Sequence, residues 1–185
     1  MKKTIWFKFA FLIGVSYLLL SLQGLAQIET TGELGKWTST KVGRQSDALS
    51  IQGKKDGTYL LKNVRAARNE GFDRVVFEFA DNLSPYNVKF TAPPFNLDES
   101  DKIVKVAGKS FLEVTFTPAR GFDFETGNRI TTYQKGKLKL PVVQETAFIY
   151  DHEGMVMFIV GLKKDKEFRV TELQNPTRLV IDFKH

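Results

Sequence analysis

From Thr58 onward the chain shows short runs in which apolar and polar residues alternate, so that every second side chain would share one face of a β-strand. The runs are rich in Val, Phe, Ile and Thr. Strands recurring at roughly 8–12-residue spacing are typical of all-β sandwiches and barrels. We therefore predict an all-β fold, an antiparallel β-sandwich or partly open barrel of about nine short strands, at 59–66, 74–79, 86–90, 102–106, 111–116, 142–150, 155–162, 168–173 and 178–183.

Two turns separate some of these runs. The Gly-Lys pair at 108–109 lies between the runs 102–106 and 111–116, and it predicts a β-hairpin that joins them. The sequence Asp-His-Glu-Gly at 151–154 predicts a second turn. A histidine in such a turn, His152, is expected to be solvated rather than to act as a base or a metal ligand.

Two of the expected strands share a charge pattern: residues 74–79 read Arg-Val-Val-Phe-Glu-Phe, and residues 178–183 read Arg-Leu-Val-Ile-Asp-Phe. Their alternate apolar residues would point inward and their charged residues outward. In an antiparallel pair Arg74 would oppose Asp182 and Glu78 would oppose Arg178, whereas a parallel pair would align like charges. We predict an antiparallel outer-face charge ladder if the strands are neighbours. The alternative is that strand composition alone produces the likeness.

The start of the chain has the pattern of a secretory signal peptide. Lysines occupy positions 2, 3 and 8 without any acid, an apolar run covers 9–22, and the small residues Gly24 and Ala26 follow. We predict cleavage after Ala26, an exported protein that is periplasmic or extracellular, and no stable membrane span after cleavage. The alternative is a membrane anchor, although the apolar run is shorter than the ~20 residues that cross a bilayer.

Residues 27–57 sustain neither a helical nor a strand period, so we predict a largely flexible N-terminal arm before a domain at 58–185. The alternative is that the arm contains a strand that docks on the edge of the domain. Removal of the signal peptide leaves 24 basic and 21 acidic residues, a net charge of +3 in place of +6. This near balance does not indicate a nucleic-acid partner.

The chain lacks cysteine, which excludes disulfides, thiolate metal sites and a thiol nucleophile. It has only two histidines, His152 and His185, so a multi-histidine metal site is nearly excluded. The acidic cluster at 98–101 lacks the spacing of a calcium loop and is expected to be solvated. No nucleophile–base set, carboxylate pair or phosphate-binding glycine loop is identified. We therefore expect no enzymatic activity, no cofactor and no metal.

The segment 118–136 is the least regular part of the expected domain. Nearly twenty residues without a clear element indicate either a functional loop or an unrecognised element. Aromatic rings next to polar groups suit a sugar or peptide surface, because rings stack on apolar faces while polar groups bond hydroxyls. The alternative is that the two Phe rings pack under the loop into the core. The candidate ligand-binding residues are Phe122, Phe124, Arg129 and Tyr133.

Two stretches carry a resemblance to a known family. Residues 71–79, Gly-Phe-Asp-Arg-Val-Val-Phe-Glu-Phe, with Tyr-Asn-Val at 86–88, resemble the start of AMIN-like domains of exported bacterial proteins. Val-Gly-Leu at 160–162, Phe-Arg-Val at 168–170 and Asn-Pro-Thr-Arg-Leu-Val-Ile-Asp-Phe at 175–183 are similar to their end and to the AMIN domains of cell-wall amidases. The resemblance implies a β-sandwich without catalytic residues that works in the cell envelope and binds peptidoglycan or assists localisation.

Two functions of different class remain open. The first is a noncatalytic envelope-binding module whose partner is peptidoglycan or another cell-wall glycan. The second is a β-domain that assembles with an envelope protein or holds a small apolar ligand. The sequence does not specify the oligomeric state.

Overall fold

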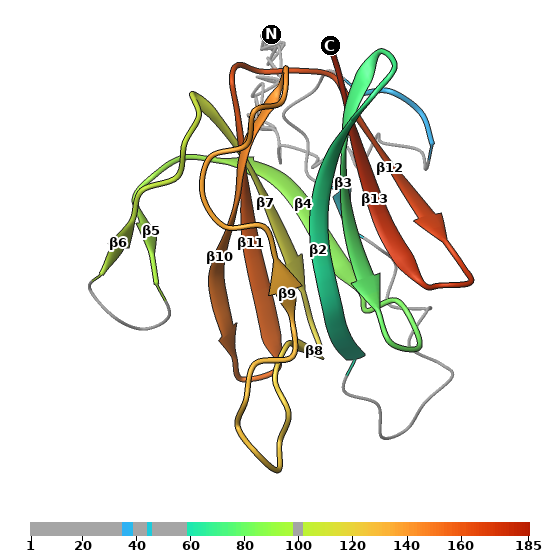
Figure 1. Ribbon diagram of the computed structural model, residues 1–185, viewed down its shortest axis with the longest axis vertical. Helices are drawn as coiled ribbons and strands as arrows, with labels where there is room; N and C mark the ends of the chain where they lie inside the picture. The colour runs from blue at the N-terminus through green and yellow to red at the C-terminus, as the bar shows by residue number, and fades with distance from the viewer. Residues whose placement is uncertain (1–34, 39–43, 46–58, 98–101) are drawn as a thin grey trace, which may run out of the picture.

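The computed structural model describes residues 35–38, 44–45, 59–97 and 102–185 (Figure 1). The expected signal peptide and the acidic cluster at 98–101 lie outside these residues, as does most of the expected arm. The described part is all-β, as predicted, and contains thirteen strands. It has no helix long and apolar enough to cross a membrane.

Two sheets face each other to form the sandwich (Figure 1). The five-stranded sheet has the order β1 (Arg44–Gln45), β4 (Tyr86–Thr91), β7 (Ser110–Phe116), β11 (Met155–Leu162) and β10 (Val143–His152). The six-stranded sheet has the order β12 (Phe168–Leu173), β13 (Arg178–Lys184), β3 (Phe72–Phe79), β2 (Tyr59–Asn69) and β8 (Ala119–Arg120), and β9 (Thr132–Tyr133) also pairs with β2. A small ribbon consists of β5 (Phe95–Asn96) and β6 (Ile103–Val104).

Phenylalanine rings from both sheets fill the space between them. Phe77 of β3 is fully buried and packs against Phe116 of β7 and Phe158 of β11, with ring centroids 5.3 and 5.7 Å apart. Tilted and edge-to-face contacts at this spacing add to the burial of apolar area. The alternation seen in the sequence therefore supplies the inward face of each sheet.

Strands β3 and β13 are antiparallel neighbours, in the register that their charge pattern predicts. Arg74 lies opposite Asp182, and Glu78 lies opposite Arg178. Arg74 and Asp182 form an ion pair at 2.7 Å. The second rung differs, because Glu78 pairs with Arg65 of β2 at 2.7 Å while Nε of Arg178 donates to the carbonyl of Pro176.

The described residues of the expected arm are docked on the domain. Thr38 bridges Phe168 at the edge of β12, and Gly35 donates its N–H to the carbonyl of Val170 at 2.7 Å. Strand β1 pairs with β4 at the edge of the other sheet. At these positions the chain pairs with the edges of the two sheets, which is the arrangement that the docked-strand alternative describes.

The hairpin predicted at 108–109 is wrong. Strand β6 pairs with β5, whereas β7 pairs with β4 and β11. The connection crosses the backbone of β11 instead of turning back on itself. A Cβ on Gly161 would overlap the carbonyl oxygen of Ala107, and one on Gly108 would lie 2.8 Å from the backbone N and O of Leu162. Glycines are thus required where the two segments touch.

The sandwich has two distinct ends (Figure 1). The β2–β3 turn, the β11–β12 connection and the end of β13 lie at one end, drawn at the top. The β10–β11 turn and the connection between β8 and β9 lie at the other. In the β10–β11 turn Glu153 and Gly154 have positive φ of 49° and 74°, which confirms the turn predicted there.

Candidate functional site

The segment 118–136, for which the sequence predicted no secondary structure, contains a short hairpin at residues 121–131, which we call the aromatic hairpin. It leaves the sheet at β8 and returns at β9, and both of these strands pair in parallel with β2. Phe122 and Arg129 form a bridge, and the N–H of Asp123 donates to the carbonyl of Asn128 at 2.8 Å. Both ends of the hairpin are therefore fixed to one strand of the sandwich.

The base of the aromatic hairpin is tightly packed. Buried Thr131 donates its hydroxyl to the carbonyl of Leu61 on β2 at 2.7 Å. The N–H of Gly121 donates to Oδ1 of Asp151 at 3.1 Å. A Cβ on Gly121 would overlap Oγ1 of Thr131, so only glycine fits this close approach.

Asp123 organises the tip. Its Oδ1 accepts hydrogen bonds from the N–H groups of Glu125 and Thr126, each at 2.9 Å, and from the hydroxyl of Thr126 at 3.2 Å. Side-chain-to-backbone bonding of this kind is characteristic of Asp in turns. The backbone hydrogen bond from Thr126, as the largest cause, lowers the pKa of the Asp123 carboxyl from its ordinary value.

Two of the candidate rings lie together on the hairpin. Phe122 and Phe124 meet edge to face at 5.2 Å. The guanidinium of Arg120 lies 4.3 Å from the centre of the Phe124 ring, and its Nη1 donates to the carbonyl of Phe122 at 2.5 Å. Phe124 is 65% exposed, so it does not follow the alternative in which both rings enter the core. Phe122 is half-buried.

The other two candidates meet at a ring that the sequence analysis did not select. Tyr133 stacks on Phe148 of β10 at 5.9 Å, and the guanidinium of Arg129 lies 3.8 Å from the centre of the same ring. Arg129 also lies 3.6 Å from Oδ2 of Asp151. Tyr133 reaches the core, because its ring packs edge to face on Phe158 at 5.7 Å.

The four candidates therefore form two groups that the bridge between Phe122 and Arg129 joins. Arg120, Phe148 and Asp151 belong to the same surface and were not predicted. Phe148 lies within the strand predicted at 142–150 and was given no role of its own, and Arg120 gave no signal beyond its place at the start of the loop. Asp151 was seen only as a turn residue.

In the part of the chain that the structure describes, the charged groups outside the hairpin show no arrangement for metal binding. No cluster of three or more His, Asp or Glu side chains in the described ranges could hold a metal ion. His152 is exposed at the end of β10, next to the ring of Tyr150. The ladder residues Arg74, Glu78, Arg178 and Asp182 lie on the outer face of the six-stranded sheet. Ion pairs of Arg74, Asp182 and Glu78 connect neighbouring strands, whereas Arg178 bonds the carbonyl of Pro176 in the adjacent turn.

The fold and the site define an all-β sandwich that carries a fixed, partly exposed aromatic hairpin at one end. The family model of the AMIN-like domain matches residues 59–185, which is most of the chain, and the protein belongs to this family. The domain is accordingly a module related to the cell envelope. Comparison with curated proteins and with solved structures gave no match.

Proposed function

We propose that the protein is a noncatalytic, exported binding module of the cell envelope that recognises peptidoglycan or a related wall glycan through its aromatic hairpin. The observation that carries this proposal is the exposure of Phe124, 65%, on a hairpin whose base is fixed to β2. A large exposed ring on an ordered element is the feature that sugar rings stack against.

The surroundings of Phe124 support a binding role. Arg120 holds the ring from one side, and Phe122 holds it at its edge. A ring that is fixed before binding loses little side-chain entropy when a ligand covers it. Arg129 and the hydroxyl-bearing Tyr133 lie in the adjoining group and supply polar atoms for sugar hydroxyls or peptide groups.

The noncatalytic character is part of the proposal. The polar side chains at the hairpin are engaged in structural contacts: Thr131 with Leu61, Asp123 with the tip, and Asp151 of the neighbouring strand β10 with Gly121. These contacts hold the hairpin rather than pair a nucleophile with a base. Recognition by such a surface needs no chemical step.

A retention assay on purified sacculi tests the proposal, with Phe124→Ala as the variant and Ile103→Ala as the matched control. Ile103 is also a large exposed side chain, 59% exposed, but it lies on the β5–β6 ribbon. Both substitutions remove exposed side chains and should leave folding intact. We expect sacculi to retain the unaltered protein and the Ile103 variant, and to lose most of the Phe124 variant.

Two results would overturn the proposal. The first is retention of the unaltered protein no higher than that of an unrelated β-protein. The second is equal retention of the Phe124 and Ile103 variants. Native mass spectrometry then tests the other function, because a stable complex with an envelope protein or a co-purified apolar molecule would be visible as added mass.

A further inference from the structure

Six lysines line hollows at the end of the sandwich opposite the aromatic hairpin. The net charge of the chain does not reveal this, because acids elsewhere offset it. Figure 1 shows this end, with the β11–β12 connection and the end of β13, at the top. Two hollows lie at this end, and Lys163 lines one of them while its neighbour Lys164 lines the other. We call their lysines the lysine end: Lys109, Lys137, Lys163, Lys164, Lys166 and Lys184.

The first hollow, of about 410 Å³, contains three lysines and no acid in its lining. Its lysines come from three separate segments, which the backbone holds together. The N–H of Lys109 donates to the carbonyl of Leu162 at 2.7 Å, and the N–H of Lys163 donates to the carbonyl of Val142 at 2.9 Å. The outward direction of Lys137 is explained by its neighbour Leu138, which packs against the core while Lys137 is exposed.

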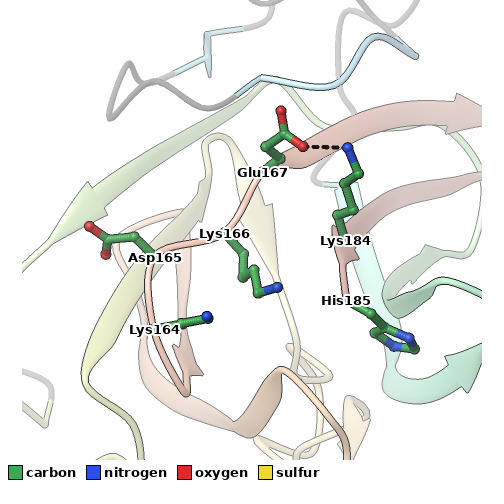
Figure 2. A pocket seen from close by; sticks show the side chains of 6 residues that line it. All are labelled: Lys164, Asp165, Lys166, Glu167, Lys184 and His185. Atoms are coloured by element: carbon green, nitrogen blue, oxygen red, sulfur yellow. Dashed lines mark hydrogen bonds and ion pairs between the residues drawn. The ribbon is translucent and has the colours of Figure 1, made fainter.

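Figure 2 shows the second hollow, of about 420 Å³, on the β11–β12 connection and the end of β13. Lys184 is turned to Glu167, with Nζ 2.7 Å from Oε2. Lys164 and Lys166 make no ion pair with any described residue. The ring of His185 is held by Asp73, 2.9 Å from its Nε2, so this wall of the hollow is ordered.

Positive charge predominates in the two hollows, and most of it lies in the first. Together their linings contain six lysines and two acids, and both acids, Asp165 and Glu167, line the second hollow, where Glu167 pairs with Lys184. Concave surfaces lined by one sign of charge focus the field and raise the local concentration of the opposite charge. A ligand with repeated negative charges could occupy both hollows at once, which a single small anion could not do.

The type of cation is compatible with phosphate groups. Planar, bidentate pairing with carboxylate or phosphate is typical of arginine, and no arginine lines either hollow. A lysine ammonium acts as a compact point charge and approaches phosphate oxygens from many directions. We propose that the lysine end is a second binding site, which takes a linear polymer with repeating phosphate groups and does not depend on glycan recognition by the aromatic hairpin.

Short-chain linear polyphosphate is the probe, and its binding to the purified protein is measured by calorimetry at several salt concentrations. We expect binding that weakens steeply with salt, because each lysine contact releases counterions. The variants Lys137→Gln/Lys163→Gln and Lys164→Gln/Lys166→Gln should each bind about tenfold or more weakly, by analogy with lysines near an anionic surface. The matched control Lys62→Gln/Lys89→Gln removes equal charge from β2 and β4 and should bind as the unaltered protein does.

The Phe124→Ala variant separates this site from the proposed function, because it should no longer be retained on sacculi but should still bind polyphosphate. Four results overturn the inference: no binding at low salt, equal weakening of the lysine variants and the control, equal binding of polygalacturonate as a carboxylate polymer, or binding to phosphatidylglycerol vesicles without binding to polyphosphate. All the substituted lysines except Lys166 are exposed, and circular dichroism of each variant checks that the fold is kept.

Discussion

Arg74 on β3 and Asp182 on β13 lie directly opposite each other, and the guanidinium donates from Nε to Oδ1 at 2.7 Å and from Nη2 to Oδ2 at 3.0 Å. Arg169, on the next strand β12, donates to Oδ2 of the same carboxylate at 2.8 Å. The side chain of Asp182 is only 1% exposed. The hydrogen bond to Asp182, as the largest cause, raises the pKa of Arg74 above its ordinary value. One carboxylate thus ties three strands together.

Asp182→Asn should therefore lower the free energy of unfolding by about 2–3 kcal/mol, because a buried, charge-assisted network loses its central acceptor. Denaturant unfolding followed by circular dichroism measures the change. Glu70→Gln, at the exposed turn between β2 and β3, is the control and should change stability by less than about 0.5 kcal/mol. Equal stability of the two variants would show that the network contributes nothing measurable.

The register of β3 and β13 could be predicted because it depends on local information. Six-residue alternation sets the inward face, and the order of charges distinguishes antiparallel from parallel pairing. Strands β8 and β9 contain two residues each, which is too short for any period to be visible. The hairpin at 108–109 was predicted wrongly for a different reason. The contact of Ala107 with Gly161 joins distant segments, and no local pattern records it.

The candidate site was predicted only in part, because contacts between segments that are distant in the sequence leave no local pattern. Aromatic and polar residues in an irregular segment identified the hairpin, but its partners come from neighbouring strands. Phe148 lies within an expected strand, and its ring is covered by Arg129 rather than fully buried. Arg120 contributes to the site only because the hairpin folds back and brings the ring of Phe124 over its guanidinium.

Gly161→Ala tests the close crossing of the 106–109 segment over β11. The added Cβ would overlap the Ala107 carbonyl and lie 3.0 Å from a methyl carbon of Val106, so the backbone would have to move. Overpacking of this kind costs about 1–3 kcal/mol or more. Thermal unfolding should show a clear fall in Tm.

Gly127→Ala is an informative control for that variant. Its φ is +68°, but a Cβ there would meet nothing within 4 Å, so only the left-handed conformation is penalised, by about 1–2 kcal/mol at a hairpin tip. If Gly161→Ala were no more destabilising than Gly127→Ala, the crossing would not be tightly packed. The Val-Gly-Leu motif would then need another explanation.

The tip of the aromatic hairpin should respond to acid. Because the folded pKa of Asp123 is lowered, its hydrogen bonds stabilise the tip above the ordinary Asp pKa of about 3.9, and this stabilisation is lost as pH falls through the lower, folded pKa. NMR titration of the Asp123 carboxyl carbon should give a midpoint below the ordinary value. The amide of Thr126 should shift with the same midpoint. A midpoint at or above the ordinary value would contradict the hydrogen bonding at the tip.

Arg120→Gln tests whether the cation under Phe124 positions the ring for binding. The guanidinium contacts the ring face and also bonds the carbonyl of Phe122, so its removal should free the ring without unfolding the sandwich. An exposed cation–π contact contributes about 0.5–1 kcal/mol, which corresponds to roughly two- to fivefold in affinity. Retention on sacculi should therefore fall less than in Phe124→Ala.

The double variant separates positioning from simple loss of charge. If Arg120 acts through Phe124, Arg120→Gln should have little further effect once the ring is absent, and the two changes should be non-additive. If Arg120 contacts the ligand independently, the two losses should add fully. The exposed Lys62→Gln variant controls for the change in net charge and should show full retention. Additive losses would contradict the positioning role of Arg120 and make it a direct ligand contact.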